Sequence, residues 1–148
     1  MNQQTESPKS FQNFVYEKKI SVDPSKLNLF WEKLNLRETF IDAQVFPYKV
    51  EFETGLKSGS FKTGELNIHH GPFLSVHGCI GKVSESYRDL NYFYGSYALS
   101  FRLVRPTRLE FFKENDGIHL KLYTFIKPWF VPFWRLGNNF FWRFFNVL

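Results

Sequence analysis

Three histidines and a cysteine lie close together in the middle of the chain: His69, His70, His77 and Cys79. Imidazole nitrogens and a thiolate sulfur are ligands that zinc prefers. The spacing argues against a zinc site, because adjacent His69 and His70 point to opposite faces of a strand and neither C-x-x-C nor H-E-x-x-H is present. The sequence therefore predicts surface or half-buried histidines and a small apolar cysteine, with no metal and no cofactor.

His77 and Cys79 could also be combined with distant acidic residues into a nucleophilic relay. However, the chain has no G-x-S-x-G nucleophile elbow, and it has neither a G-x-G-x-x-G pattern nor a P-loop for a nucleotide. No set of residues demands a reaction. The catalytic residues are therefore unknown, and a binding protein is favoured over an enzyme.

A further group of polar residues belongs to three predicted strands late in the chain: Arg102, Arg108, Glu110, His119 and Tyr123. Their positions favour a solvated outer sheet face, where cross-strand pairs of opposite charge add a little stability. The alternative places one or two of them inside a cavity, to orient a polar head group or to act as acid and base.

The segment 116–148 organises the predicted fold. Residues 118–127 alternate between two faces, with Ile118, Leu120, Leu122, Thr124 and Ile126 on one side, as in a half-buried strand. Apolar residues then recur at steps of three and four, which is typical of an amphipathic helix over 133–148: Phe133, Leu136, Phe140, Phe141 and Phe144. Pro132 suits its first turn. We expect this stripe to face a sheet, because a helix that ends a mostly β chain must bury its apolar side.

The earlier part of the chain predicts one strand and then two helices. Residues 11–22 form the strand. Asp23 is expected to cap the next helix, with Pro24 at its first position. Leu27, Phe30, Trp31 and Leu34 make one apolar face of that helix. A second short helical turn follows over 36–42.

The central region predicts strands over 43–52, 65–70, 73–84, 92–104 and 107–113. Residues 86–91 are interpreted as a loop, Arg105-Pro106 as a bend, and 114–117 as a hairpin turn. The chain is therefore of the α+β class, with a curved antiparallel sheet of six to seven strands wrapped around a long C-terminal helix. Residues 1–10 are predicted to be a disordered polar tail, and 11–148 a single domain.

Composition narrows the class of protein further. The 148 residues include 19 Phe, 7 Tyr and 4 Trp, which suit an aromatic core or a pocket for a bulky apolar ligand. The net charge of +5 is scattered along the chain, which argues against nucleic acid. A lone cysteine excludes an intrachain disulfide, and neither a signal peptide nor a membrane span is evident. We therefore expect a cytoplasmic protein.

The order of these elements resembles the START-like (SRPBCC, helix-grip) superfamily, which includes polyketide cyclases, lipid-transfer domains and the birch-pollen-allergen family. Three segments carry the resemblance: residues 16–27 (YEKKISVDPSKL), the late strands 109–112 (LEFF) and 117–122 (GIHLKL), and the long helix after Lys127-Pro128. The resemblance implies a cavity between sheet and helix, usually for an apolar ligand, and it carries no universal catalytic residue. One departure is Gly137-Asn138-Asn139 inside the helix, where Gly costs about 1 kcal/mol relative to Ala and favours a kink.

Together these observations predict binding of a hydrophobic small molecule or lipid between the sheet and the last helix. The candidate ligand-binding residues are Phe30, Trp31, Leu99, Phe101, Leu109, Phe111, Leu120, Leu122, Phe133, Leu136, Phe140 and Phe144. One alternative is an enzyme on the same fold, a cyclase, dehydratase or hydrolase. Another is an interaction protein, because the aromatic and arginine-bearing C-terminus, with no acidic residue after Asp116, also suits a membrane interface or a partner. The oligomeric state stays open.

Overall fold

The computed structural model describes residues 10–42, 45–71, 75–95 and 102–145. Within these ranges, seven strands form one antiparallel sheet in the order β1-β7-β6-β5-β4-β3-β2. The strands are β1 (Gln12–Ser21), β2 (Lys49–Phe52), β3 (Leu66–His70), β4 (Ser75–Val83), β5 (Tyr87–Gly95), β6 (Val104–Glu114) and β7 (Gly117–Ile126). The helical elements are α1 (Leu27–Lys33), α2 (Arg37–Asp42), a 3₁₀ turn η1 (Pro128–Phe130) and α4 (Val131–Phe144).

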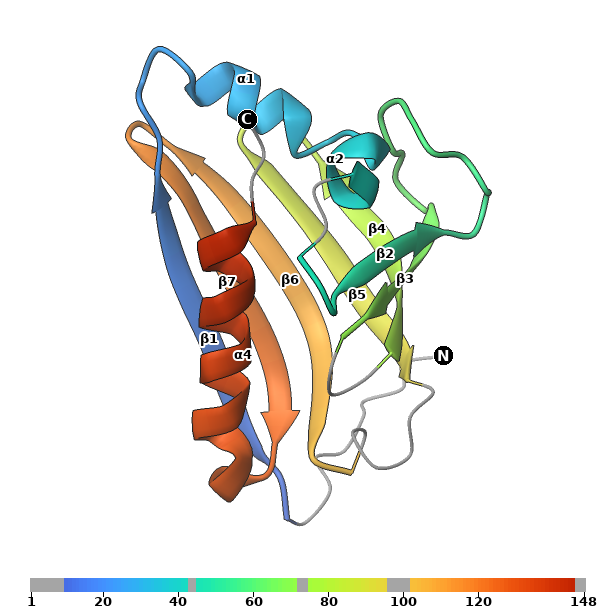
Figure 1. Cartoon of the computed structure of the whole chain (residues 1–148), viewed down its shortest axis with the longest axis vertical. Helices are drawn as coiled ribbons and strands as arrows, with labels where there is room; N and C mark the ends of the chain where they lie inside the picture. Colours follow the sequence, from blue (N-terminus) through green and yellow to red (C-terminus); the bar gives the residue numbers. More distant parts are fainter. Residues whose placement is uncertain (1–9, 43–44, 72–74, 96–101, 146–148) are drawn as a thin grey trace.

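The sheet is bent, and α4 lies along its concave side while α1 and α2 close one end (Figure 1). Strands β2 to β7 pair in sequence order, and β1 pairs with β7 over its whole length. This confirms the predicted helix-grip arrangement. In the part of the chain that the structure describes, no helix is long and apolar enough to cross a membrane.

Strand β7 follows the predicted alternation. Ile118, Leu120, Leu122, Thr124 and Ile126 are all buried on the inner face. The predicted hairpin turn is also confirmed, because Glu114 pairs with Gly117 across it. A Cβ built on Gly117 would lie only 2.1 Å from the Ile20 carbonyl oxygen of β1, so the close approach of these two strands requires glycine.

Several strand predictions were wrong, including the single strand expected over 92–104, because Arg102 and Leu103 lie in a turn before β6. Residues 86–91 were expected to form a loop, but Tyr87 to Asn91 pair with β6 as the first half of β5. The polar residues Arg88 and Asp89 made this segment look like a loop in the sequence. Both are buried in the folded protein, where residues of other elements supply their partners. The expected bend at Arg105-Pro106 lies inside β6, where a shift in register between Pro106 and Arg108 accommodates the proline.

The start of α1 also differs from the prediction. Asp23 does not cap the helix. Its Oδ1 accepts hydrogen bonds from the Ser25 N–H and hydroxyl at 2.8 and 2.7 Å, which closes a local turn. Helix α1 begins at Leu27, after Lys26, and Pro24 lies in the turn before it. The predicted apolar face of the helix is confirmed, because its four residues are buried: Leu27, Phe30, Trp31 and Leu34.

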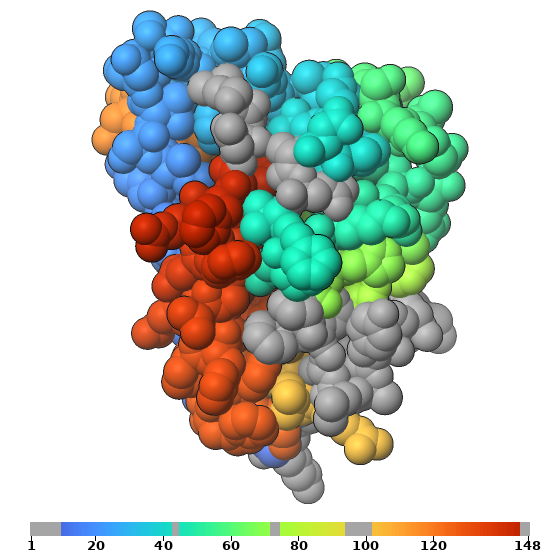
Figure 2. All heavy atoms as spheres, in the orientation of Figure 1, coloured from blue at the N-terminus to red at the C-terminus, as the bar shows by residue number. Residues whose placement is uncertain are grey.

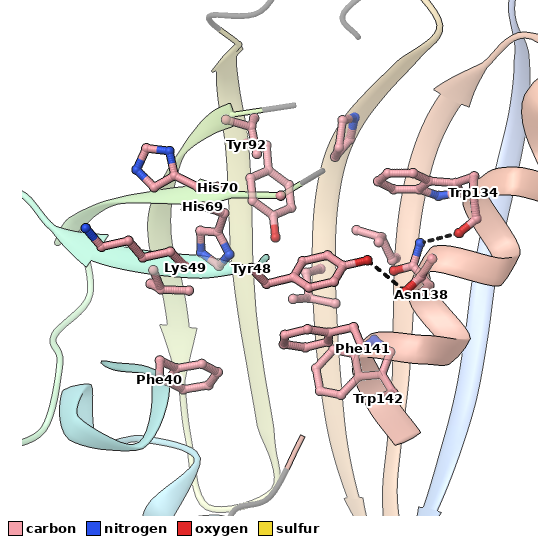
Figure 3. A pocket seen from close by; sticks show the side chains of 17 residues that line it. Phe40, Tyr48, Lys49, His69, His70, Tyr92, Trp134, Asn138, Phe141 and Trp142 are labelled. Carbon is pink, nitrogen blue, oxygen red and sulfur yellow. Dashed lines mark hydrogen bonds between the residues drawn. The ribbon is translucent and has the colours of Figure 1, made fainter. Parts of the chain in front are cut away.

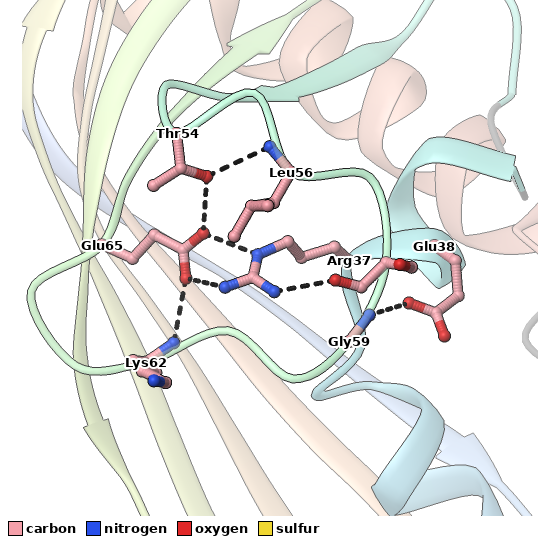
Figure 4. Close-up of polar contacts among 8 residues, drawn as sticks. Arg37, Glu38, Thr54, Leu56, Gly59, Lys62 and Glu65 are labelled. Atoms are coloured by element: carbon pink, nitrogen blue, oxygen red, sulfur yellow. Dashed lines mark hydrogen bonds and ion pairs between the residues drawn. The ribbon is translucent and has the colours of Figure 1, made fainter.

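A buried ion pair joins α2 to the loop before β3 (Figure 4). Arg37 donates through Nε and Nη2 to the two carboxylate oxygens of Glu65 at 2.7 and 2.8 Å, and through Nη1 to the Ser58 carbonyl at 2.8 Å. Burial opposes the ionisation of Glu65 most strongly, but hydrogen bonds from Arg37 and the Lys62 N–H outweigh it and lower the pKa of the carboxyl. The pair fixes this end of the sheet against α2.

Candidate functional site

A cavity of about 120 Å³ lies between the inner side of α4, the concave face of the sheet and the segment leading into β2 (Figure 3). The sheet contributes Leu109 from β6 and Leu122 from β7 to its floor. Its other prominent lining residues are Phe40, Tyr48, Lys49, His69, His70, Tyr92, Trp134, Asn138, Phe141 and Trp142. The cavity is partly open to solvent, and its wall is mostly apolar.

Aromatic contacts hold the walls of the cavity in place. Tyr48 packs on Phe141 with ring centroids 4.8 Å apart, and Phe111 of β6 meets Trp142 edge to face at 5.9 Å. The Tyr48 hydroxyl donates to the Gly137 carbonyl at 2.8 Å. The sequence predicted a kink at Gly137, but helix α4 runs unbroken through it. Gly137 is instead the point at which Tyr48 contacts the helix.

Two polar atoms in the cavity wall are shielded from solvent and have no hydrogen-bond partner among the described residues: His69 Nε2 and Trp134 Nε1. Buried polar atoms are nearly always satisfied, so each of these calls for a partner that the protein itself does not supply. Trp134 Nε1 can only donate, whereas neutral His69 can present a donor or an acceptor at Nε2. Neither atom presents surface to a water molecule, so a guest in the cavity could satisfy either one only after the neighbouring side chains shift.

Burial controls the charge state of the polar lining. It lowers the pKa of His69 to about 4, assisted by the positive charges of Arg88 and His70, and it raises the pKa of Tyr92. The two rings meet edge to face, with centroids 5.4 Å apart. At neutral pH both side chains are therefore uncharged, and they offer hydrogen bonds without charge to a guest.

Arg88 is a buried cation behind the cavity. Its guanidinium lies 4.4 Å from the centroid of the Phe111 ring and 4.8 Å from that of Phe61, and its Nη1 donates to the Leu34 carbonyl. Burial lowers the pKa of Arg88 to about 9, so it stays protonated at neutral pH. The Phe111 and Phe61 rings stabilise this charge through cation–π contacts. The hydrogen bond to Leu34 tethers β5 to the C-terminal end of α1.

The depressed pKa of His69 makes a testable contribution to stability. The unfolded chain binds a proton at this residue below pH 6.5, whereas the folded chain does so only near pH 4, so stability falls as the pH drops through this window. Between about pH 7 and pH 5 the expected loss is about 2 kcal/mol. Urea unfolding at both pH values should show that His69→Gln loses correspondingly less than the wild type. An equal pH dependence in both proteins would show that His69 is not shielded.

A second hollow, of about 500 Å³, runs along the edge strand β2. It is larger than the cavity under α4, and the charged side chains of Lys49, Glu51, Glu53 and Lys57 are among its lining residues. Charged groups at an open surface stay hydrated, so this hollow offers little to an apolar molecule. The cavity under α4 is therefore the candidate site.

The structure brings only some of the predicted ligand-binding residues to the cavity. Leu109 and Leu122 line it. Phe30, Trp31, Phe111 and Leu120 are buried in the core beyond the lining. Leu99 and Phe101 lie outside the described residues.

The predicted face of the last helix was wrong. Phe133, Leu136, Phe140 and Phe144 point away from the sheet and are 45 to 69% exposed. The helix buries Trp134 and Trp142 instead, with Asn138 and Phe141 beside them on the inner side. Both sides of the helix are aromatic, and the inner one also recurs at steps of three and four. Periodicity alone therefore could not choose between them.

The sequence prediction missed Tyr48, His69, Tyr92, Trp134 and Asn138 as lining residues. Trp134, Asn138 and Trp142 are spaced by four residues, and this spacing was the available signal for a second helical face. His69 was weighed only as a metal ligand. No local pattern marks Tyr48, which precedes a strand and reaches the cavity through the path of the chain.

Three other residues were considered as metal ligands or nucleophiles. His77 and Cys79 do not line the cavity, and His70 lines it but contacts residues outside it. His70 contacts Ser75 Oγ at 2.7 Å and Glu51 at 3.3 Å, and His77 contacts Glu53 at 3.1 Å. Cys79 is half-buried. Across the described ranges, no three histidine, cysteine or acidic side chains converge as metal ligands would.

The polar group of the late strands, apart from Arg102, lies on the opposite face of the sheet. Arg108 Nη2 donates to Asp89 at 2.8 Å and to the Tyr87 hydroxyl at 2.6 Å, and the hydroxyl of Tyr123 donates to Glu110 at 2.8 Å. His119 contacts Glu17 of β1 at 3.2 Å, and Arg102 is exposed before β6. None of the five residues of the group lines the cavity; the outer-face interpretation applies to the four on β6 and β7, whereas Arg102 lies in a turn and not on a strand as predicted.

Comparison with protein-family models and with curated proteins gives no match. Among solved structures, the chain is similar to norcoclaurine synthase from Thalictrum flavum in complex with dopamine and hydroxybenzaldehyde (16% identity, TM-score 0.49, 88% of this chain and 86% of that one). It is also similar to major latex-like protein 151 from Panax ginseng (12%, 0.47, 80% of each chain) and to Ara h 8.0201 (14%, 0.45, 90% and 95%). These are likenesses of fold at low identity. The helix-grip architecture of this chain rests on its own strand order and helix placement.

Proposed function

We propose that this protein binds a small, mainly apolar molecule with at least one hydrogen-bonding group in the cavity under α4. The observation that carries the proposal is a mostly apolar cavity wall that includes two residues with a solvent-shielded, unpartnered polar atom, Trp134 Nε1 and His69 Nε2. An apolar guest gains by burial against the aromatic rings. Its polar group gains a hydrogen bond that the empty wall leaves unmade.

The size of the cavity limits the ligand. Its volume of about 120 Å³ is close to the roughly 150 Å³ of an engineered apolar cavity that binds benzene, and well below the roughly 300–1,000 Å³ of typical drug-sized sites. A single substituted ring fits this space. A lipid or a larger molecule would place only one end in the cavity, with the remainder outside it.

Phenol and toluene are matched probes for the proposed site, because they share a ring and differ in the polar group. Isothermal titration should show that phenol binds more tightly than toluene. Replacing Trp134 by Phe removes the indole N–H, and it is expected to weaken phenol binding about threefold to tenfold while sparing toluene. An equal loss for both probes would show that Trp134 does not contact the polar group. Failure of the wild type to bind either probe would refute the proposal.

An enzyme on the same fold is the alternative, since His69 and Tyr92 bring polar groups into the cavity. Their pKa values weigh against it. A general base works best with a pKa near the operating pH, whereas the pKa of His69 is about 4 and that of Tyr92 is raised. Both residues are better suited to holding a ligand than to moving its protons. Turnover of a cavity ligand that His69→Gln abolishes would favour the enzyme.

The proposed site lies entirely on the inner side of α4. Contact with a membrane, which the aromatic C-terminus also suggested, would use the opposite side of this helix and is a separate proposal.

A further inference from the structure

The outer face of α4 is an exposed apolar surface that cavity binding does not use. It consists of Phe133, Leu136, Phe140 and Phe144, together with Trp129 of the preceding turn η1, which is 61% exposed. Phe140 and Phe144 contact each other with ring centroids 5.0 Å apart. Single exposed apolar residues are normal, but a contiguous row along one helix marks an interaction surface. Figure 2 shows α4, in orange and red, on the visible face of the molecule.

The rotation of α4 about its axis is fixed, so this exposure is not a loosely packed core. Trp134 and Trp142 are buried on the inner side. Two hydrogen bonds hold the helix from either side: Tyr16 of β1 donates to Asn139 at 2.7 Å, and Tyr48 donates to the Gly137 carbonyl at 2.8 Å. Turning the outer face inward would break both bonds and expose the two tryptophans.

The charged residues of α4 itself are both positive, and the Arg135 guanidinium lies 5.4 Å from the centroid of the Phe14 ring of β1. Arg135 and Arg143 are exposed on α4, and the Arg143 guanidinium lies 5.7 Å from the centroid of the Phe144 ring. The sequence contains no acidic residue after Asp116. Trp and Phe rings with flanking arginines are typical of helices that lie in the headgroup zone of an anionic bilayer.

We propose that the outer face of α4 docks this protein onto a membrane surface that contains anionic lipid. The 14 residues of α4 give a helix about 21 Å long, and it would lie flat in the interface with its exposed rings among the acyl-chain ends. Arg135 and Arg143 would meet lipid phosphates. A second copy of the chain is a poorer occupant, because a two-fold contact through this face would bring four arginines together without an acid to pair them.

Co-sedimentation with vesicles tests this proposal. The vesicles are phosphatidylcholine alone, or phosphatidylcholine with about 30% phosphatidylserine. The wild type should bind the anionic vesicles more tightly, and high salt should weaken that binding. The double variant Leu136→Ser, Phe140→Ser is expected to lose at least about tenfold in affinity, because it removes two apolar side chains from the interface. Arg143→Glu should lose about fivefold or more, on anionic vesicles only.

The matched control is Leu29→Ser, Leu56→Ser. It removes two apolar side chains of similar exposure, 50 and 53%, from α1 and from the loop after β2. The control should bind vesicles like the wild type. Phenol binding should persist in all variants, which separates this proposal from the function of the cavity.

Three results would overturn membrane docking. One is equal vesicle binding by the wild type and the Leu136, Phe140 double variant. Another is equal binding to neutral and anionic vesicles. The third is a wild-type dimer in sedimentation velocity that the double variant converts to a monomer, which would make the outer face an interface between copies.

Discussion

Replacing Leu122 by tryptophan is expected to weaken the binding of phenol and of toluene by at least about tenfold. Leu122 is almost fully buried on the inner face of β7 and lines the cavity. An indole at this position would occupy much of the cavity's volume of about 120 Å³. The same substitution overpacks the wall and is expected to cost about 1–3 kcal/mol of unfolding free energy. Titration of the folded variant with both probes measures the effect.

Phe125→Trp is the matched control for this substitution. Phe125 lies on the outer face of the same strand, three residues along, so it receives the same ring without entering the cavity. Leu122→Ala is the converse change. It should enlarge the cavity and admit a two-ring probe such as naphthalene, while costing about 2–5 kcal/mol of stability. Undiminished phenol binding by Leu122→Trp would place the ligand elsewhere.

The Glu65→Gln variant is expected to be less stable than the wild type by about 3–5 kcal/mol at neutral pH. Its amide cannot balance the charge of Arg37, which is buried with only 7% of its side chain exposed. The hydrogen bond from Thr54 to Glu65 at 3.3 Å and that from the Lys62 N–H would also be altered. Urea denaturation at neutral pH measures the loss.

A second variant separates charge from packing. Arg37→Met combined with Glu65→Leu removes both charges and should recover at least half of the lost stability, because an apolar pair of similar volume often replaces a buried ion pair at little cost.

The contribution of Glu65 also depends on pH. Its pKa is lowered in the folded state, so its stabilisation is present above its usual pKa of 4.5 and is lost as the pH falls through the lowered value. If Glu65→Gln is as stable as the wild type, the ion pair between Arg37 and Glu65 contributes nothing to the free energy of unfolding.

The order of elements could be predicted from local patterns because those patterns reflect short-range constraints. Alternation in 118–127 identified the inner face of β7, and the turn chemistry of 114–117 identified its hairpin. The failures occur where tertiary partners override the local signal. Arg88 and Asp89 look like loop residues until the rings behind the cavity and the neighbouring strands accommodate them.

The cavity was harder to predict than the fold. The sequence predicted an apolar site between the sheet and the last helix, and of its candidate residues Leu109 and Leu122 line the cavity there. It selected the wrong face of α4 because Phe133, Leu136, Phe140 and Phe144 form as regular a stripe as the buried one. It also gave no indication that His69 and Tyr92 would meet, since their contact depends on the register of β3, β4 and β5.

The sequence by itself determined the class of this protein: strands with alternating burial, a closing helix rich in aromatic rings, and a chain long enough to bury a core. Its covalent order and side-chain periodicity are sufficient for this, because helix and strand periods are properties of the local backbone. Only the tertiary structure decided which side of α4 faces the sheet and which polar atoms remain unpartnered beneath it. Both outcomes depend on contacts between residues far apart in the chain, such as Tyr16 with Asn139 and Tyr48 with Gly137.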